Sequence, residues 1–229
     1  MKRTIFFALF LMMLTTACAQ QKQMVIYRNG HSPLRMSIET VDSITFEDAQ
    51  AEEHEFADLG LSVMWATCNI GAETPEQYGY YFAWGETSTK TSYTEENYSL
   101  CENGVYDTSM KTISGTERDA ATILWQDLWR MPTITEVEEL TSLCTWTWTS
   151  QNGVNGYKVT GPSGQSIFMP AAGQWRDKAV NVGSTGYYWT GTLSDDYPSA
   201  AYNLNFSGYN GRWSANRTYG FCIRAVCEK

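Results

Sequence analysis

The strongest pattern of apolar and polar positions lies in residues 129–144, WRMPTITEVEELTSLC. Thr133 follows Pro132 where an N-cap is expected, and Glu136, three residues later, completes a capping box. These residues predict a helix that begins directly after the proline. Val137, Leu140 and Cys144 recur at spacings of three and four, and Leu143 lies beside them. These residues predict one apolar face of the helix. Such a face must be buried against another element.

The pattern before this helix is less regular. Residues 117–129 have helical spacing and predict a second helix with one apolar side, formed by Ala121, Leu124, Trp125 and Leu128. Residues 59–68 alternate partly and predict a strand, whereas residues 73–81 predict a short helix. Residues 87–116 are dominated by Ser, Thr, Glu and Tyr, which predicts a long surface loop.

After residue 144 the apolar period changes to two. Residues 145–149, TWTWT, predict a strand that turns at residues 152–156 and returns as residues 157–160. Further strands are predicted at residues 166–169, 186–192, 200–206 and 220–227. Apolar side chains on one face of these strands are assigned to the core: Tyr202, Leu204, Phe206, Phe221 and Ile223. The whole pattern predicts an α+β domain with two helices early and mostly short antiparallel strands late.

The N-terminus resembles a bacterial secretion signal. Residues 1–17 have a basic start, an apolar run too short to span a bilayer, and small residues before Cys18. The sequence LTTAC at residues 14–18 resembles a lipobox, in which the cysteine becomes lipidated; cleavage near residues 17–19 without a lipid is the alternative. A lipid on Cys18 would anchor the exported chain in the outer membrane without a spanning helix, and leaves open whether it faces the surface or the periplasm.

Three segments are predicted between the signal and a main domain at residues 56–229: a tether, a small β unit and an acidic linker at residues 18–23, 24–48 and 49–55. Within the small unit, residues 24–27 and 34–38 predict a hairpin that residues 41–46, VDSITF, close. A single hairpin is marginally stable in water, so we interpret this unit as a spacer or docking element.

Charge narrows the choice of partners. The chain has 229 residues, a formal charge of -9 and no basic cluster, which argues against binding of nucleic acid or of an anionic membrane surface. No stretch after the signal is long and apolar enough to span a bilayer. Membrane contact is therefore expected through the N-terminal lipid only.

The cysteines indicate an oxidising compartment. With Cys18 set aside, five remain, which allow at most two intrachain disulfides and leave their pairing open: Cys68, Cys101, Cys144, Cys222 and Cys227. There is no CxxC pair and no nearby histidine, which disfavours a metal site. We therefore expect neither a metal nor another cofactor.

Several motifs of the main domain resemble, in order, the Fibrobacter succinogenes major paralogous domain: LGLSVMWATCNIGA (59–72), YFAWGE (81–86), WRMPT (129–133), residues 144–159, SIFMPAAG (166–173), GYYWTGT (186–192) and GFCIRAVC (220–227). The resemblance covers essentially all of residues 56–229. The hairpin with its VDSITF ending resembles a segment near the N-termini of lipoproteins from Bacteroidetes.

The WRMPT segment with its following helix and the terminal GFxxR are similar to elements of the C-type-lectin-like fold, in the branch of the formylglycine-generating enzymes and collagen-like adhesin tips. This resemblance implies a fold in which the N- and C-terminal strands pair. It implies little about activity, because one fold hosts many functions.

Enzyme chemistry finds little support among the candidate residues. Histidine occurs only at His31 and His54, before the main domain, which argues against a Ser-His-Asp triad, a Cys-His dyad or a His-ligated zinc within it. Cys222 and Cys227 are separated like the paired thiols that formylglycine-generating enzymes use with copper. However, Cys222 lies inside the Gly-Phe-Arg segment rather than before it, and residues five apart on a strand point to opposite faces. A structural disulfide or a buried thiol is the alternative interpretation.

Two pairs of acids, Asp195 with Asp196 and Glu95 with Glu96, could serve a glycosidase. Adjacent acids in polar loops are usually solvated surface groups instead. Asp195 and Asp196 could also bind calcium, but the Glu-Pro-Asn, Gln-Pro-Asp and Trp-Asn-Asp triplets of calcium-dependent lectins do not occur. The chain is therefore not expected to be an enzyme, and calcium-dependent sugar capture lacks support.

Aromatic residues are the remaining candidates for a ligand-binding site. All nine tryptophans lie in the main domain, and four of them are predicted to be core: Trp65, Trp129, Trp146 and Trp189. Loop aromatics with amide and guanidinium neighbours predict a ligand-binding surface, formed by Trp175, Tyr197, Tyr209, Asn210, Arg212, Trp213 and Tyr219. The alternative is an ordinary hairpin whose aromatics cover the edge of a sheet.

In the fold that the chain resembles, the corresponding late hairpin and loop form the ligand face. We therefore expect an exported, lipid-anchored module that binds a glycan or a protein. A structural or self-associating envelope protein is the second hypothesis, and an enzyme of the formylglycine-generating or glycosidase type is the third.

Overall fold

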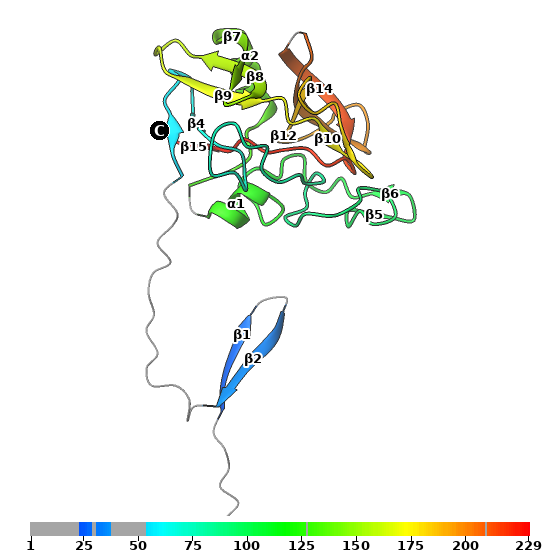
Figure 1. The fold of residues 1–229 in the computed structure, drawn as a ribbon. Helices are drawn as coiled ribbons and strands as arrows, with labels where there is room; N and C mark the ends of the chain where they lie inside the picture. Colours follow the sequence, from blue (N-terminus) through cyan, green and yellow to red (C-terminus); the bar gives the residue numbers. More distant parts are fainter. Residues whose placement is uncertain (1–22, 29–30, 38–53, 127, 209) are drawn as a thin grey trace, which may run out of the picture. The chain divides into compact units, whose positions relative to one another are not determined.

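Two units make up the chain, Met1–Ala49 and Gln50–Lys229 (Figure 1). The computed structural model describes residues 23–28, 31–37, 54–126, 128–208 and 210–229. In the first unit, β1 (Gln23–Arg28) and β2 (His31–Ser37) form an antiparallel hairpin with a register irregularity between Ile26 and Arg28. The predicted hairpin is therefore confirmed. Its predicted closing segment, residues 41–46, lies outside the described residues.

The predicted helix after Pro132 is confirmed as α2 (Ile134–Leu143). The hydroxyl of Thr133 accepts from the Glu136 amide at 3.3 Å, and the Glu136 carboxylate accepts from the Thr133 amide at 2.7 Å, which completes the capping box. Val137 and Leu140 are buried as expected. Leu143, however, is 57% exposed, because it lies at the last turn of the helix beyond the face that packs on the sheet.

The second predicted helix is shorter than its spacing suggested. Helix α1 spans only Ala120–Trp125, begins at the N-cap Asp119 and ends at Gln126, whose φ of 60° stops the helical path. Ala121 and Trp125 are buried, whereas Leu124 is 43% exposed. Leu128, predicted on the same apolar side, lies beyond the helix end and is 73% exposed. The four residues therefore do not share one buried face.

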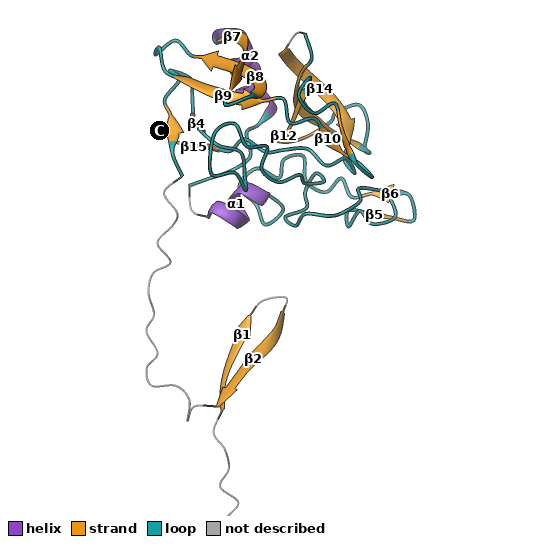
Figure 2. Ribbon diagram, in the orientation of Figure 1, coloured by secondary structure: helices purple, strands orange, loops and turns teal. Residues whose placement is uncertain are grey.

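Short antiparallel strands make up most of the rest (Figure 2). One sheet contains β7 (Thr145–Gln151), β8 (Val154–Thr160) and β9 (Ser166–Pro170), and another contains β12 (Gly186–Leu193), β13 (Ala200–Phe206) and β14 (Asn210–Asn216). Helix α2 packs against this second sheet. Together with the two helices, these strands confirm the α+β class of the described residues.

The two ends of the second unit meet in a small sheet of order β15–β4–β3. Here β4 (Met64–Ala66) pairs with β3 (Phe56–Ala57) on one side and with β15 (Val226–Cys227) on the other. Two further hairpins complete the unit: β5 (Cys101–Glu102) with β6 (Val105–Tyr106), and β10 (Gln174–Trp175) with β11 (Ala179–Val180).

Three predicted elements are wrong or too long. The strand predicted over residues 59–68 is reduced to β4, because the preceding residues bend at Gly60, where φ is 81°. Residues 73–81 form turns instead of a helix, with the Gln77 amide donating to the Thr74 carbonyl at 3.1 Å. Residues 220–227 form a strand only at β15, since their other backbone groups pair with several separate segments.

The loop predicted over residues 87–116 is not simply a surface feature. Tyr93 and Tyr98 are 4% and 2% exposed, and Ile113 is fully buried. Tyr98 donates to the Trp84 carbonyl at 2.6 Å and accepts from Arg217 at 2.9 Å. Buried tyrosines therefore fix this loop where regular secondary structure does not.

The core has two main clusters, which meet at the β12–β13–β14 sheet. The first contains Val137 and Leu140 of α2 together with Leu204 and Phe206 of β13. The second contains aromatic side chains far apart in sequence, among them Phe82, Trp84, Trp189 and Phe221. All five strand residues predicted to be core are buried: Tyr202, Leu204, Phe206, Phe221 and Ile223. Of the predicted core tryptophans, Trp65 and Trp189 are buried, while Trp129 and Trp146 are half-buried.

All five cysteines of the main unit are free thiols in the structure, so the expected disulfides are not formed there. Cys222 is fully buried and donates to the Tyr78 carbonyl at 3.2 Å, and burial raises its pKa. Burial also raises the pKa of Cys144 to about 11. Both thiols therefore stay protonated at neutral pH, as expected of buried structural cysteines.

The Arg224 side chain connects, by hydrogen bonds, segments that do not pair as strands. Its side chain is 1% exposed and donates to the Ala66 and Thr67 carbonyls at 3.0 and 2.8 Å, to the Phe168 carbonyl at 3.0 Å and to Asn69 Oδ1 at 2.9 Å. The guanidinium therefore satisfies four acceptors that would otherwise be buried without donors.

We predict that Arg224→Met lowers the free energy of unfolding by roughly 3 kcal/mol or more, because several buried acceptors lose their donor at once. Urea denaturation measures the change. Arg212→Met is the matched control, since Arg212 pairs with Glu138 at the surface at 2.9 Å and its loss should cost less than about 1 kcal/mol. Equal losses in the two variants would contradict the prediction.

A second prediction concerns Glu136. Burial by itself raises the pKa of this carboxyl, but hydrogen bonds from Arg130 and Thr133 outweigh it and hold the pKa below its usual value. Glu136 therefore stabilises the fold above its unfolded pKa of about 4.3, and this stabilisation is lost as the pH falls through the lower folded pKa. Thermal unfolding should show the difference in Tm between wild type and Glu136→Gln to be large near about pH 6 and to shrink below about pH 4. A pH-independent difference would argue against this linkage.

Candidate functional site

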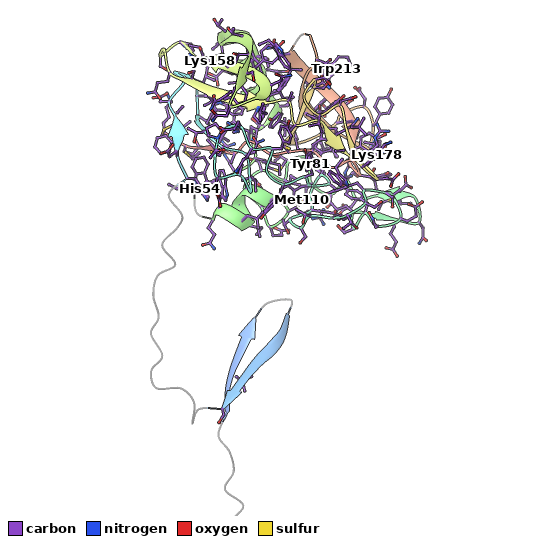
Figure 3. The ribbon with its side chains drawn as sticks, in the orientation of Figure 1. His54, Tyr81, Met110, Lys158, Lys178 and Trp213 are labelled. Atoms are coloured by element: carbon purple, nitrogen blue, oxygen red, sulfur yellow. The ribbon has the colours of Figure 1, made fainter. Side chains whose placement is uncertain are left out.

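Four aromatic side chains line one small cavity of the main unit. The cavity has a volume of about 170 Å³ and is lined by Gly79, Tyr80, Tyr81, Thr89, Lys90, Tyr93 and Trp175. These residues come from three separate stretches of the chain, and Figure 3 marks Tyr81 among the side chains of the unit. We call this cavity the aromatic pocket.

Trp175 is the one predicted ligand-binding residue that lines the aromatic pocket. It ends β10, and its backbone exchanges two hydrogen bonds with Gly220, at 2.7 and 2.9 Å. Its indole N–H donates to the Thr91 carbonyl at 3.2 Å, and its ring centroid lies 5.7 Å from that of Tyr81. Contacts from two loops therefore hold the indole in place.

Tyr81 and Tyr93 are fixed by their own hydroxyls. Tyr81 donates to the Ala172 carbonyl at 2.7 Å, and Tyr93 donates to the Tyr81 carbonyl and accepts from the Lys90 amide at 3.1 Å. Burial raises the pKa of both phenols, so they remain protonated donors at neutral pH.

Lys90 also lines the pocket, and its positive charge is neutralised by the Glu86 carboxylate. Its ammonium lies 2.6 Å from Glu86 Oε2 and donates to the carbonyl and to the side chain of Asn97 at 2.5 and 3.3 Å. The Lys90 ammonium is therefore paired with a carboxylate and bonded within the protein beside the pocket.

Tyr80 forms the exposed rim of the pocket. Its side chain is 50% exposed, and its ring packs over Gly71, where any Cβ would collide with the ring. Gly71 also has a φ of 77°, which glycine adopts readily. The glycine therefore makes room for the ring at the pocket edge.

The other predicted site residues are distributed over different surfaces. Tyr219 precedes Gly220 and stacks beneath Arg176, whose guanidinium carbon lies 4.0 Å from the ring centroid. This cation–π pair adjoins Trp175 through the bonds between Trp175 and Gly220. Tyr197 is 62% exposed in the connection from β12 to β13.

Strand β14 places its predicted residues on both faces of the sheet. Arg212 pairs with Glu138 of α2 at 2.9 Å and lies 5.1 Å from the Tyr202 ring centroid. Trp213, one position further, faces the opposite side, is 45% exposed and pairs in register with Asn203. In Figure 3, Trp213 lies apart from Tyr81. Asn210 begins this strand, and Tyr209 lies outside the described residues.

The structure therefore places Trp175 in the aromatic pocket and Tyr219 next to Gly220, the backbone partner of Trp175, but it does not bring the whole predicted set together. It adds residues that the sequence analysis did not propose: Tyr80, Tyr81, Lys90 and Tyr93. The motif YFAWGE contains Tyr81 and supported the family resemblance, but its sequence did not indicate a pocket. Only the meeting of distant loops reveals these residues as neighbours.

The enzyme candidates remain dispersed among the described residues. Asp195 and Asp196 are exposed, and Glu95 accepts from the Tyr106 hydroxyl at 2.9 Å. Cys222 is buried, whereas Cys227 belongs to the edge strand β15. No group of three or more His, Cys, Asp or Glu side chains suited to a metal occurs in the described part of the chain.

His54 belongs with the main unit, contrary to its predicted place in the linker. Its ring stacks on Trp125 with centroids 3.7 Å apart, and it lines a cavity of about 310 Å³ together with Cys68 and Glu73. Stacking on the buried Trp125 explains this placement. The two residues are far apart in the chain, so no local sequence pattern indicates their contact. His54 precedes the predicted domain boundary in sequence, but it packs within the second unit.

Comparisons with known proteins found no matching family model, curated protein or solved structure. In the described residues, no helix has the length and apolar character that crossing a bilayer requires.

We predict that Gly220→Ala disturbs the aromatic pocket. A Cβ there would lie 2.9 Å from the Tyr93 ring and 3.1 Å from Trp175 Cβ, so one wall must move. The free energy of unfolding should fall by about 1–3 kcal/mol, and the near-ultraviolet circular dichroism of the aromatic residues should change. Gly211→Ala is the control, because a Cβ at Gly211 meets nothing within 4 Å. An unchanged spectrum in Gly220→Ala would show that this glycine is not needed for the pocket.

Proposed function

We propose that the chain is an exported, lipid-anchored binding module that recognises a glycan or a protein through the aromatic pocket and the neighbouring Tyr219. The observation that carries this proposal is the convergence of Tyr80, Tyr81, Tyr93 and Trp175 on one cavity. Aromatic side chains supply large, rigid contact areas and are enriched where proteins bind ligands. The acid pairs and the pair Cys222 and Cys227 that were candidates for catalysis do not line this cavity, which favours binding there.

The proposal includes the C-type-lectin-like fold of the major paralogous domains. The pairing of β15 with β4 and of β4 with β3 supports it, because the resemblance implies that the terminal strands of the domain pair. The position of α2 directly after the WRMPT segment supports it as well. Within this proposal, the domain spans residues 56–229.

The proposed location is the outer membrane, with a lipid on Cys18 as the anchor. The support is the sequence of residues 1–18, which resembles a lipoprotein signal. The β1–β2 hairpin would then act as a spacer between the tether and the binding module. Its two short strands and the marginal stability of lone hairpins argue against an active role for this unit.

The test is a binding screen of residues 19–229 against arrays of glycans and of host or envelope proteins, with calcium and with a chelator. We predict a saturable ligand whose affinity falls at least about tenfold in Trp175→Ala, since buried aromatic contacts commonly contribute this much or more. Surface plasmon resonance gives the affinity, and the chelator arm shows whether a metal takes part.

Trp148→Ala serves as the matched control. Trp148 is 45% exposed on β7, in a different sheet from the pocket, so its loss should leave the affinity unchanged. Equal loss in both variants would refute the site assignment. A folded domain that binds no ligand but forms oligomers with increasing concentration would instead support the envelope-scaffold function.

A further inference from the structure

The aromatic pocket offers rings but few hydrogen-bonding side chains. The Tyr81 hydroxyl donates to the Ala172 carbonyl, the Tyr93 hydroxyl to the Tyr81 carbonyl, and the Trp175 indole N–H to the Thr91 carbonyl. These three polar hydrogens are thus used within the protein. Among the lining side chains of the described structure, the hydroxyls of Tyr80 and Thr89 remain as donors for a ligand, and the Tyr81 hydroxyl oxygen remains as an acceptor.

Lys90 does not alter this balance. Its ammonium is paired with Glu86 at 2.6 Å and bonded twice to Asn97, so its charge is neutralised beside the pocket. A monosaccharide in this cavity would lose water from several hydroxyls and regain few partners, which is unfavourable. The pocket chemistry therefore favours a ligand group that needs no hydrogen bonds.

A quaternary ammonium group meets this requirement. It has no N–H to satisfy, and its positive charge is attracted to the electron-rich faces of tyrosine and tryptophan. A volume of about 170 Å³ suits one small head group, being below the range of drug-sized sites. The formal charge of -9 further favours the approach of a cation.

We propose that the aromatic pocket is a cage for a quaternary ammonium group, with Tyr80, Tyr81, Tyr93 and Trp175 as its walls. This inference rests on the proposed function only in that the aromatic pocket binds a ligand, and at this site it names a quaternary ammonium group in place of a sugar. The ligand can be a free choline-like molecule or the choline head group of a lipid, which carry the same cation.

The test compares choline with 3,3-dimethylbutan-1-ol, its neutral isostere, by isothermal titration calorimetry on residues 19–229. Choline should bind saturably and at least about tenfold more tightly, because only the cation interacts with the ring quadrupoles. The choline methyl resonances should also shift upfield on binding, as expected for protons above aromatic rings. Equal affinities for the two compounds, or no binding of choline, would overturn the proposal.

Substitutions at Tyr80 separate ring from hydroxyl. Since this side chain is half exposed, its replacement should leave the fold intact, and thermal unfolding checks this. Tyr80→Leu should weaken choline binding at least about fivefold, whereas Tyr80→Phe, which keeps the ring, should bind like wild type. A Tyr80→Phe variant as weak as Tyr80→Leu would show that the hydroxyl, not the ring face, holds the ligand.

Binding experiments with two kinds of lipid vesicle identify the source of the quaternary ammonium group. Binding to phosphatidylcholine but not to phosphatidylglycerol vesicles assigns the group to a lipid, and binding to choline alone assigns it to a free molecule. Trp175-dependent capture of a glycan or protein without choline binding would overturn this inference and leave the proposed function standing. If the protein binds neither choline nor a glycan or protein, both this inference and the proposed function are overturned.

Discussion

Two buried arginines hold together a domain with little regular secondary structure. Arg224 donates to the carbonyls of Ala66, Thr67 and Phe168, and Arg217 donates to those of Asp107 and Pro198. Phe168 lies within the edge strand β9, and the other carbonyls belong to loops and strand ends, where a continuous sheet would have paired them with backbone amides. A guanidinium has five N–H groups in a fixed plane, so one side chain can replace several ladder hydrogen bonds at a junction of segments.

The aromatic pocket depends on this arrangement. Arg217 bonds to the Tyr98 hydroxyl at 2.9 Å and lies over the Trp84 ring at 4.6 Å, which fixes the stretch that also contains Tyr81, Lys90 and Tyr93. Gly220, between the two arginines in sequence, pairs with Trp175. The same buried contacts that replace a sheet therefore bring the pocket walls together.

The polar hydrogens of Tyr81, Tyr93 and Trp175 are used within the domain. These hydroxyls and the indole N–H stabilise the loops, and this use preorganises the rings before a ligand arrives. The neutralised pair of Lys90 and Glu86 anchors the wall without adding net charge.

The sequence by itself determined the elements with strong local signals. The capping box of Thr133 and Glu136 specified where α2 begins, and the alternation of TWTWT specified β7, because both signals act between residues close in the chain. It also predicted Trp175 as a ligand-binding residue, which stays a prediction although Trp175 lines the aromatic pocket. The tertiary structure decided where α1 ends, that residues 73–81 form turns, and that Tyr80, Tyr81 and Tyr93 meet Trp175. The meeting of the pocket residues depends on bonds between residues far apart in the chain, such as that from the Tyr81 hydroxyl to the Ala172 carbonyl, 91 positions away, which no local pattern encodes.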